Sequence, residues 1–165
     1  HDYWMNDYFE KELGIKVFKE PEVFVFNSKS FFIGHGDGLG PGDKGYKRMK
    51  LMLSNPFFIW LFRLIHPDIG ISLGKYFSQK NTLISGEKDL SFKGEDNEWL
   101  IRYCKKKLFE DHIDYFIFGH RHLPINHSLK NKSKYINLGD WISHYTYGVF
   151  DGKSFNLRSF NSENA

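Results

Sequence analysis

The sequence contains one cysteine, Cys104, and few long apolar stretches among its 165 residues. A single cysteine cannot form an internal disulfide, which excludes a small secreted module held by disulfides and favours a reducing compartment such as the cytoplasm. The longest strongly apolar run, residues 57–65, includes Arg63 and is far shorter than the ~20 residues of a membrane-spanning helix. No signal-peptide pattern follows His1. We therefore expect a cytoplasmic chain without a membrane span.

The composition is that of a folded chain, with 41% hydrophobic, 26% charged and 18% aromatic residues, and it excludes a disordered or fibrous protein. The net charge of +3 is unevenly distributed, because residues 44–80 contain seven basic residues and one acidic residue, which leaves −3 for the remainder. This basic segment also contains the apolar run. The combination suits an anionic amphiphile or a membrane surface, and it argues against nucleic acid as the partner.

The pattern of the N-terminal part predicts one short helix and a hairpin. Residues 7–13 form the helix candidate, with Gly14 placed to end it. Residues 22–26 and 30–33 are rich in Val, Phe and Ile and are predicted to be the two strands. A loop rich in Gly and Pro follows over residues 36–45.

Residues 44–81 are predicted to be a helical insertion that acts as a lid. Pro56, Pro67, Gly70 and Gly74 are expected to divide it into helices of no more than a few turns. The remaining elements are predicted to be an amphipathic helix over residues 95–109, a buried strand over 115–118, and three further strands over 135–138, 147–150 and 153–160. Asp151-Gly152 predicts a type I′ hairpin between the last two strands. We expect residues 1–165 to form one α/β domain in which β-sheet layers are flanked by helices.

Two predicted strands each end in a histidine that follows a glycine: Gly34-His35-Gly36-Asp37 and Gly119-His120-Arg121-His122. Glycine allows close approach of the backbone to a metal or phosphate, and a strand end holds an imidazole on a rigid element. The His-x-His spacing can present two imidazoles to two neighbouring ions. The alternative is that each histidine is an ordinary surface or core residue.

Two aspartates are candidates for residues that support the metal-binding histidines, whereas four further histidines are not taken as metal ligands. Asp37 could fix the tautomer of the His35 ring from outside the ligand set, and an ordinary turn residue is an equally good interpretation; Asp140 has the same standing. Arg121 is expected to point away from the metals as a structural or surface residue. The histidines without a strand-end glycine are taken as ordinary residues: His66, His112, His127 and His144.

His1-Asp2 and the two glycine-histidine elements resemble, in this order, the last three motifs of the calcineurin-like metallophosphoesterases: Gly-Asn-His-Asp, Gly-His and Gly-His-x-His. The family's opening motifs, Asp-x-His and Gly-Asp, would precede His1. The resemblance therefore implies the C-terminal two-thirds of an enzyme, a fragment that is expected to be inactive alone. It also implies the family's four-layer α+β fold, a β-sandwich flanked by helices.

The resemblance also implies a ligand set. His35 and His120 would bind one divalent metal ion and His122 a second one, with manganese as the expected metal. His1 would act as a catalytic residue by assisting at the leaving oxygen.

The resemblance is most specific to the metallophosphoesterases that cleave the pyrophosphate of UDP-2,3-diacylglucosamine in lipid A biosynthesis. It implies a peripheral enzyme on the cytoplasmic face of the bacterial inner membrane, with UMP and 2,3-diacylglucosamine 1-phosphate as products. Tyr46 matches a substrate-contacting tyrosine of these enzymes, and four further residues fall where polar contacts of the lid are expected: Lys75, Ser78, Lys80 and Asn81.

Two alternatives remain open from the sequence. The best-known members of this group have arginine at the position of His1, so a generic metallophosphoesterase that acts on another phosphodiester is one. The other is a non-catalytic fragment that binds lipid surfaces through residues 57–65 and their basic flanks.

Overall fold

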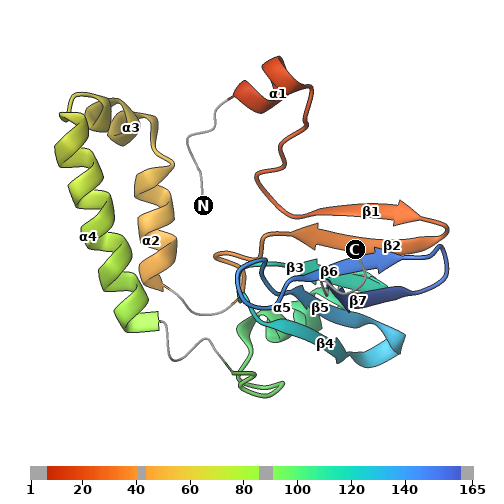
Figure 1. Ribbon diagram of the computed structural model, residues 1–165. Helices are drawn as coiled ribbons and strands as arrows, with labels where there is room; N and C mark the ends of the chain where they lie inside the picture. Colours follow the sequence, from red (N-terminus) through yellow and green to blue (C-terminus); the bar gives the residue numbers. More distant parts are fainter. Residues whose placement is uncertain (1–6, 41–43, 86–90, 161–165) are drawn as a thin grey trace. The chain divides into compact units, whose positions relative to one another are not determined.

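The computed structural model describes residues 7–40, 44–85 and 91–160, and it divides into two units (Figure 1). The helical unit comprises His1–Val17 and Gly42–Lys88, and the sheet unit comprises Phe18–Pro41 and Asp89–Ala165. All the described strands lie in the sheet unit. The predicted mixed α/β class is confirmed.

The sheet unit is built on a five-stranded mixed sheet with the strand order β1-β2-β3-β5-β4. The central strands β2, β3 and β5 run parallel, whereas β1 and β4 pair antiparallel at the two edges. The strands are β1 (Glu22–Phe26), β2 (Lys29–Gly34), β3 (Tyr115–Phe118), β4 (Pro124–Ser128) and β5 (Lys134–Leu138). A short 3₁₀ turn, η1 (Lys130–Lys132), connects β4 to β5. The parallel centre places the ends of β2 and β3 at the same edge of the sheet.

One face of this sheet packs against the helix α5 (Trp99–Lys107). The helix contributes Leu100, Ile101 and Cys104, all with no exposed surface. Lys105, Lys106 and Lys107 lie together in its last turn, where cations complement the helix dipole. The sheet contributes buried aromatic side chains to the same cluster: Phe32, Phe116, Phe118 and Tyr135.

The other face packs against a second, two-stranded sheet of β6 (Thr146–Phe150) and β7 (Phe155–Ser159). The cluster between the sheets joins Phe155 of β7 to four residues of the five-stranded sheet: Phe31, Tyr115, Ile117 and Ile136. Residues on the two faces alternate along β2 and β3, as the period of a strand requires. The expected β-sandwich with a flanking helix is therefore present within the described residues.

Both predicted hairpins are present, with one difference in a turn. Phe26 pairs with Lys29, so the first turn has two residues, and the positive φ of both, Asn27 (46°) and Ser28 (61°), is the type I′ geometry. The second turn was predicted to be type I′ at Asp151-Gly152, and this is wrong. Phe150 pairs with Phe155, because the Asp151 carboxylate accepts the amides of Lys153 and Ser154 at 2.8 and 2.7 Å and closes a four-residue loop.

The described helices of the other unit are α1 (Tyr8–Leu13), α2 (Lys44–Leu53), α3 (Pro56–Arg63) and α4 (Pro67–Ser85). Gly14 ends α1 in the left-handed conformation, as predicted. The side chain of Asn55 accepts the Phe57 amide and caps α3, with Pro56 in the first turn. No helix within the described ranges is long and apolar enough to cross a bilayer.

The expectation that Gly70 and Gly74 divide the insertion is wrong. The helix α4 runs through both glycines for 19 residues and passes the predicted boundary at residue 81. A glycine costs an exposed helix only about 1 kcal/mol relative to alanine, which does not stop a helix of this length. Prolines at the first turn of α3 and α4, by contrast, do mark where these helices begin.

Candidate functional site

The candidate site lies where β2 and β3 end side by side. Gly34 pairs with Phe118 in the parallel register, and the Gly119 amide donates to the His35 carbonyl at 3.1 Å. The chain therefore stays paired for one residue beyond each strand. A side chain on Gly119 would contact the His35 ring, with Nδ1 at 3.5 Å from its Cβ. The glycine that precedes His120 leaves this space to the imidazole.

The structure brings together the two histidines that the sequence singled out at these strand ends. His120 Nδ1 lies 3.4 Å from His35 Nε2, and the rings meet edge to face with centroids 5.2 Å apart. Trp99 of α5 also contacts His120, with ring centroids 5.7 Å apart. The two imidazoles are 85 residues apart in sequence, and the parallel sheet is what unites them.

This distance suits two ligands of one metal ion. Two nitrogens at ~2.1 Å from a tetrahedral ion lie about 3.4 Å apart, and the ring nitrogens of His35 and His120 are separated by 3.4 Å. Burial lowers the pKa of His35, and the neighbouring His120 ring lowers it further, while the Asp37 carboxylate raises it. A lowered pKa favours the neutral imidazole, which is the form that binds metal.

His122 is less closely placed. Its side chain is exposed, although its charge is near enough to lower the pKa of His35. Within the ranges that the structure describes, no three His, Cys, Asp or Glu side chains gather as a metal-binding group. Among the described residues, the pair His35 and His120 thus fits part of a metal site.

The other predicted site residues fall into two groups. Lys75 is an exposed residue of α4, and it lies in the helical unit. Five predictions cannot be placed, because the residue or its side chain lies outside the described part of the chain: His1, Tyr46, Ser78, Lys80 and Asn81.

The two aspartates differ in their surroundings. Asp37 is half-buried and favours the charged form of His35, so a supporting role stays a prediction. Asp140 holds its own turn, because its Oδ1 accepts amides from Ser143, Ile142 and His144 at 2.6, 2.9 and 3.2 Å. These amides, that of Ser143 most strongly, hold the pKa of Asp140 well below its usual range.

The four histidines taken as ordinary residues each have a local contact outside the pair of His35 and His120. His66 lies near Asp68, His112 near Asp114, His127 near Glu95 and His144 near Asp140, at 3.4, 3.8, 3.7 and 3.2 Å respectively. Their interpretation as ordinary residues stays a prediction.

Arg121, between the two histidines of the turn, is buried and forms an ion pair with Glu98 at 3.1 Å. The sequence left open whether this arginine is structural or at the surface, and Glu98 was not among the residues that it singled out. A charged residue inside a His-x-His turn that directly follows a wholly apolar strand is the only sequence signal that points to such a contact.

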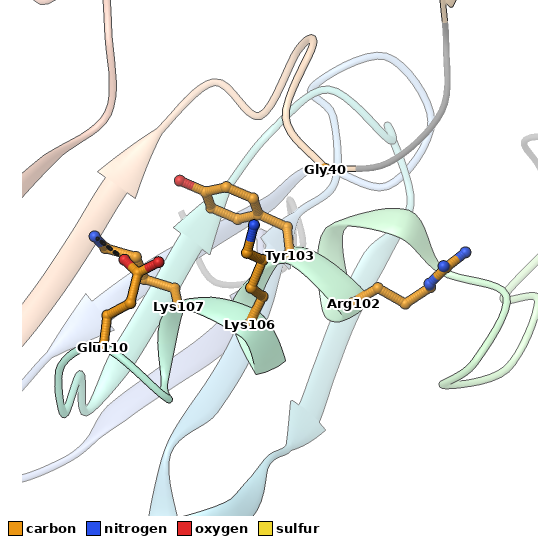
Figure 2. A pocket seen from close by; sticks show the side chains of 6 residues that line it. All are labelled: Gly40, Arg102, Tyr103, Lys106, Lys107 and Glu110. Carbon is orange, nitrogen blue, oxygen red and sulfur yellow. Dashed lines mark hydrogen bonds and ion pairs between the residues drawn. The ribbon is translucent and has the colours of Figure 1, made fainter.

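A hollow with a volume of about 580 Å³ lies on the outer side of α5, next to the loop that continues from His35 (Figure 2). Lys107 is held there by Glu110 at 3.0 Å. The remaining lining residues are Gly40, Arg102, Tyr103 and Lys106. None of the residues predicted to bind metal or substrate lines it, so this hollow is not the strand-end site.

Comparison with known proteins identifies relatives whose sequences align with nearly the whole length of this chain. A protein of Porphyromonas gingivalis named UDP-2,3-diacylglucosamine hydrolase is 33% identical over 96% of the chain and 65% of its own length. Proteins of the same name from Pseudomonas fluorescens and Photorhabdus laumondii are 26% and 27% identical over 96% of the chain, and the alignments cover 63% and 66% of them. No protein-family model matches the chain.

The strand-end histidines, the layered fold and these relatives agree with the resemblance to the metallophosphoesterases. The chain is a homologue of curated proteins named UDP-2,3-diacylglucosamine hydrolase. The resemblance seen in the motifs is thereby confirmed. The chain spans slightly under two-thirds of the length of these curated relatives.

Proposed function

We propose that the complete protein hydrolyses the pyrophosphate of UDP-2,3-diacylglucosamine, a lipid-linked nucleotide sugar. One P–O bond of the pyrophosphate breaks, water adds across it, and the products are UMP and 2,3-diacylglucosamine 1-phosphate. The observation that carries the proposal is the placement of His35 beside His120 at 3.4 Å in a homologue of enzymes that bear this substrate in their name.

His35 and His120 are proposed to bind a divalent metal ion, with manganese as the expected species and His122 directed to a second ion. Bound divalent ions supply positive charge that stabilises a phosphoryl transition state, and they lower the pKa of water. The chain's own contribution is to favour the neutral imidazole of His35 by lowering its pKa and to hold both rings at the end of a rigid sheet.

The helical unit is proposed to bind the acyl chains. Phe57, Phe58 and Trp60 of α3 are 59%, 42% and 55% exposed, so these large apolar side chains are not buried in a core. The ring centroids of Phe58 and Trp60 lie 5.6 and 6.2 Å from that of Phe57, which makes one apolar patch. Such a patch beside basic residues suits two acyl chains that carry an anionic headgroup, and it is also suited to peripheral binding at a membrane surface. We propose the cytoplasmic face of the bacterial inner membrane as that surface.

A pair of histidine variants tests the chemistry. His120→Ala in the complete protein should reduce hydrolysis of UDP-2,3-diacylglucosamine by at least ~100-fold, because a metal ligand is lost. His127→Ala is the matched control, since this histidine lies against Phe92 and Glu95 and away from His35. Equal activity of the two variants, or full activity of the wild-type protein after its metal has been removed by chelation, would contradict the proposed chemistry.

A second experiment tests the substrate. Serine at positions 57, 58 and 60 together should weaken turnover of the diacylated substrate, while hydrolysis of a small chromogenic phosphodiester should be retained. If both substrates lose activity equally, these aromatics do not act as an acyl site. A generic phosphodiesterase would then be the better description.

A further inference from the structure

A buried ion pair joins Arg121, the middle residue of the His-x-His turn, to Glu98. The side chains of Arg121 and Glu98 are 3% and 1% exposed, and the guanidinium Nη2 lies 3.1 Å from the carboxylate Oε1. Removing two charges from water is costly, and two apolar side chains of similar size would often be at least as stable at such a position. The stability of the core alone therefore does not account for this pair.

The pair ties three segments of the sheet unit together. The same Arg121 Nη2 also donates to the Ser91 carbonyl at 3.1 Å, and Glu98 Oε1 also accepts the Lys93 amide at 3.1 Å. Glu98 itself is the residue that precedes α5. The turn after β3, residues 91–93 and the start of α5 thus meet at one ion pair.

The backbone that the pair anchors is unusual. His120 and His122 have φ values of 53° and 50°, in the left-handed region that residues with a Cβ seldom adopt. Such a conformation persists only where the surrounding structure imposes it. Arg121 lies between the two histidines, so a fixed arginine side chain restrains the backbone on both sides of it.

A second contact holds the same turn from the sheet. The Asn137 side-chain amide donates to the Gly119 carbonyl, and its Oδ1 accepts the Gly139 amide at 3.2 Å. The Gly119 carbonyl also accepts the Arg121 amide at 2.6 Å. Asn137 is completely buried. The end of β5 and the start of α5 therefore clamp the turn from two directions.

We propose that Arg121 and Glu98 are positioning residues, which impose the left-handed turn and thereby direct the imidazoles of His120 and His122 toward bound metal. The role at a metal rests on the proposed function, whereas the effect on the two rings does not. Neither residue touches the reacting atoms; both act through the backbone of the two histidines. The alternative is a purely structural ion pair.

The two roles separate in a set of methionine variants of the complete protein. Arg121→Met or Glu98→Met leaves one buried charge without its partner and should lower the melting temperature. The double variant leaves no such charge, so its melting temperature should return close to that of the wild type. The His-x-His turn of the double variant still lacks the ion pair that restrains its backbone. Lys107→Met with Glu110→Met is the matched control, because it removes an exposed ion pair of 3.0 Å at the end of the same helix.

Two measurements report positioning. The first is the set of histidine ring resonances in the metal-free protein by NMR, and those of His120 and His122 should shift in the double variant. The second is Mn²⁺ affinity by titration calorimetry, which should fall at least ~10-fold in the single and double variants, as is usual for residues that orient metal ligands. The control variant should leave both readouts unchanged.

The possible outcomes separate the two proposals. Recovery of wild-type ring resonances and Mn²⁺ affinity in the double variant would overturn the positioning role, because an ion pair that serves only stability is replaceable by apolar side chains. A wild-type protein that binds no Mn²⁺, in which the double variant still shifts both rings, would overturn the proposed function and support positioning. If the wild-type protein binds Mn²⁺ and the double variant binds it equally well with unshifted ring resonances of His120 and His122, the positioning role is overturned and the proposed function is supported.

Discussion

The sheet unit and the helical unit use apolar side chains in opposite ways. Every side chain that is buried among the described residues belongs to the sheet unit, where two clusters pack against the two faces of one sheet. In the helical unit, α1 and α3 bury no residue at all. Exposed large apolar side chains recur along its helices: Leu51, Met52, Phe57, Trp60, Leu64, Ile69 and Ile71.

This difference shows what apolar residues do in each unit. Burial of large side chains provides the main favourable free energy of folding, and in the sheet unit this is already achieved. Apolar surface that stays exposed is typical of a binding surface for a lipid or another apolar partner. The exposure of the apolar side chains of α3 is the observation on which the acyl-binding proposal rests.

The largest expected contrast is between one phenylalanine in each unit. Phe116 is 0% exposed and Phe57 is 59% exposed. Phe116→Ala should cost about 3–5 kcal/mol of unfolding free energy, because it leaves a cavity beside α5, whereas Phe57→Ala should cost less than about 0.5 kcal/mol. Urea denaturation of the complete protein measures both. Similar losses for the two variants would show that α3 is packed into a core.

A second contrast concerns acid stability. Burial raises the pKa of Asp114, but hydrogen bonds from Lys29 and Ser30 outweigh it and lower this pKa to about 2. The contacts are Lys29 Nζ to Oδ1 at 2.8 Å, and the Ser30 amide and hydroxyl to Oδ2 at 2.9 and 3.0 Å. Because the pKa in the unfolded chain is about 3.9, this aspartate stabilises the fold above about pH 4, and the contribution disappears as the pH falls toward about 2.

Asp114→Asn should therefore lower the unfolding free energy by about 2 kcal/mol at about pH 7 and by almost nothing at about pH 2. The matched control is Asp68→Asn in the first turn of α4, where the side chain is 86% exposed, and it should change stability little at either pH. The measurement is the urea midpoint of each variant across this pH range. A loss in acid as large as that at neutral pH would show that shape, and not charge, makes Asp114 stabilising.

A third contrast uses one glycine of each unit. Gly36 has φ +104°, and a Cβ there would lie 3.3 Å from Leu100 Cδ1, so Gly36→Ala should destabilise by about 1–3 kcal/mol. Gly74 lies inside α4, and a Cβ added there would have no neighbour within 4 Å, so Gly74→Ala should stabilise the helix by about 0.5–1 kcal/mol. Thermal melts of both variants test the two signs. A stabilising Gly36→Ala would show that this backbone relaxes freely beside His35.

Sequence patterns predicted the elements whose side chains alternate clearly or are uniformly apolar, and missed those set by tertiary contacts. The strand at residues 115–118 was predicted with its observed bounds, because all four of its side chains are apolar and buried. The strand β4 was missed, since it begins with Pro124 and contains Asn126 and His127. Proline is tolerated there because β4 is an edge strand. The helix predicted over residues 95–109 begins only at Trp99. The residue before it, Glu98, forms the buried ion pair with Arg121.

For the site, the sequence predicted which histidines would meet but not what holds them. Glycines at two strand ends were enough to bring His35 and His120 into one hypothesis, and their contact confirms the predicted convergence of this pair. The buried pair of Glu98 and Arg121 was not predicted, because the two residues are 23 positions apart and only the position of Arg121 inside the His-x-His turn points to a buried contact. Only the packing of α5 against the sheet brings them together.

The rate at which Cys104 is alkylated measures how often α5 separates from the sheet. Its thiol has no exposed surface, and burial raises its pKa far above the usual range, so the folded protein should resist alkylation. Modification of this thiol then requires α5 to lift from the sheet, and the labelling rate is proportional to the fraction of time that the helix spends open. Cys104 is the only cysteine among these 165 residues, so labelling at this position reports the opening of α5.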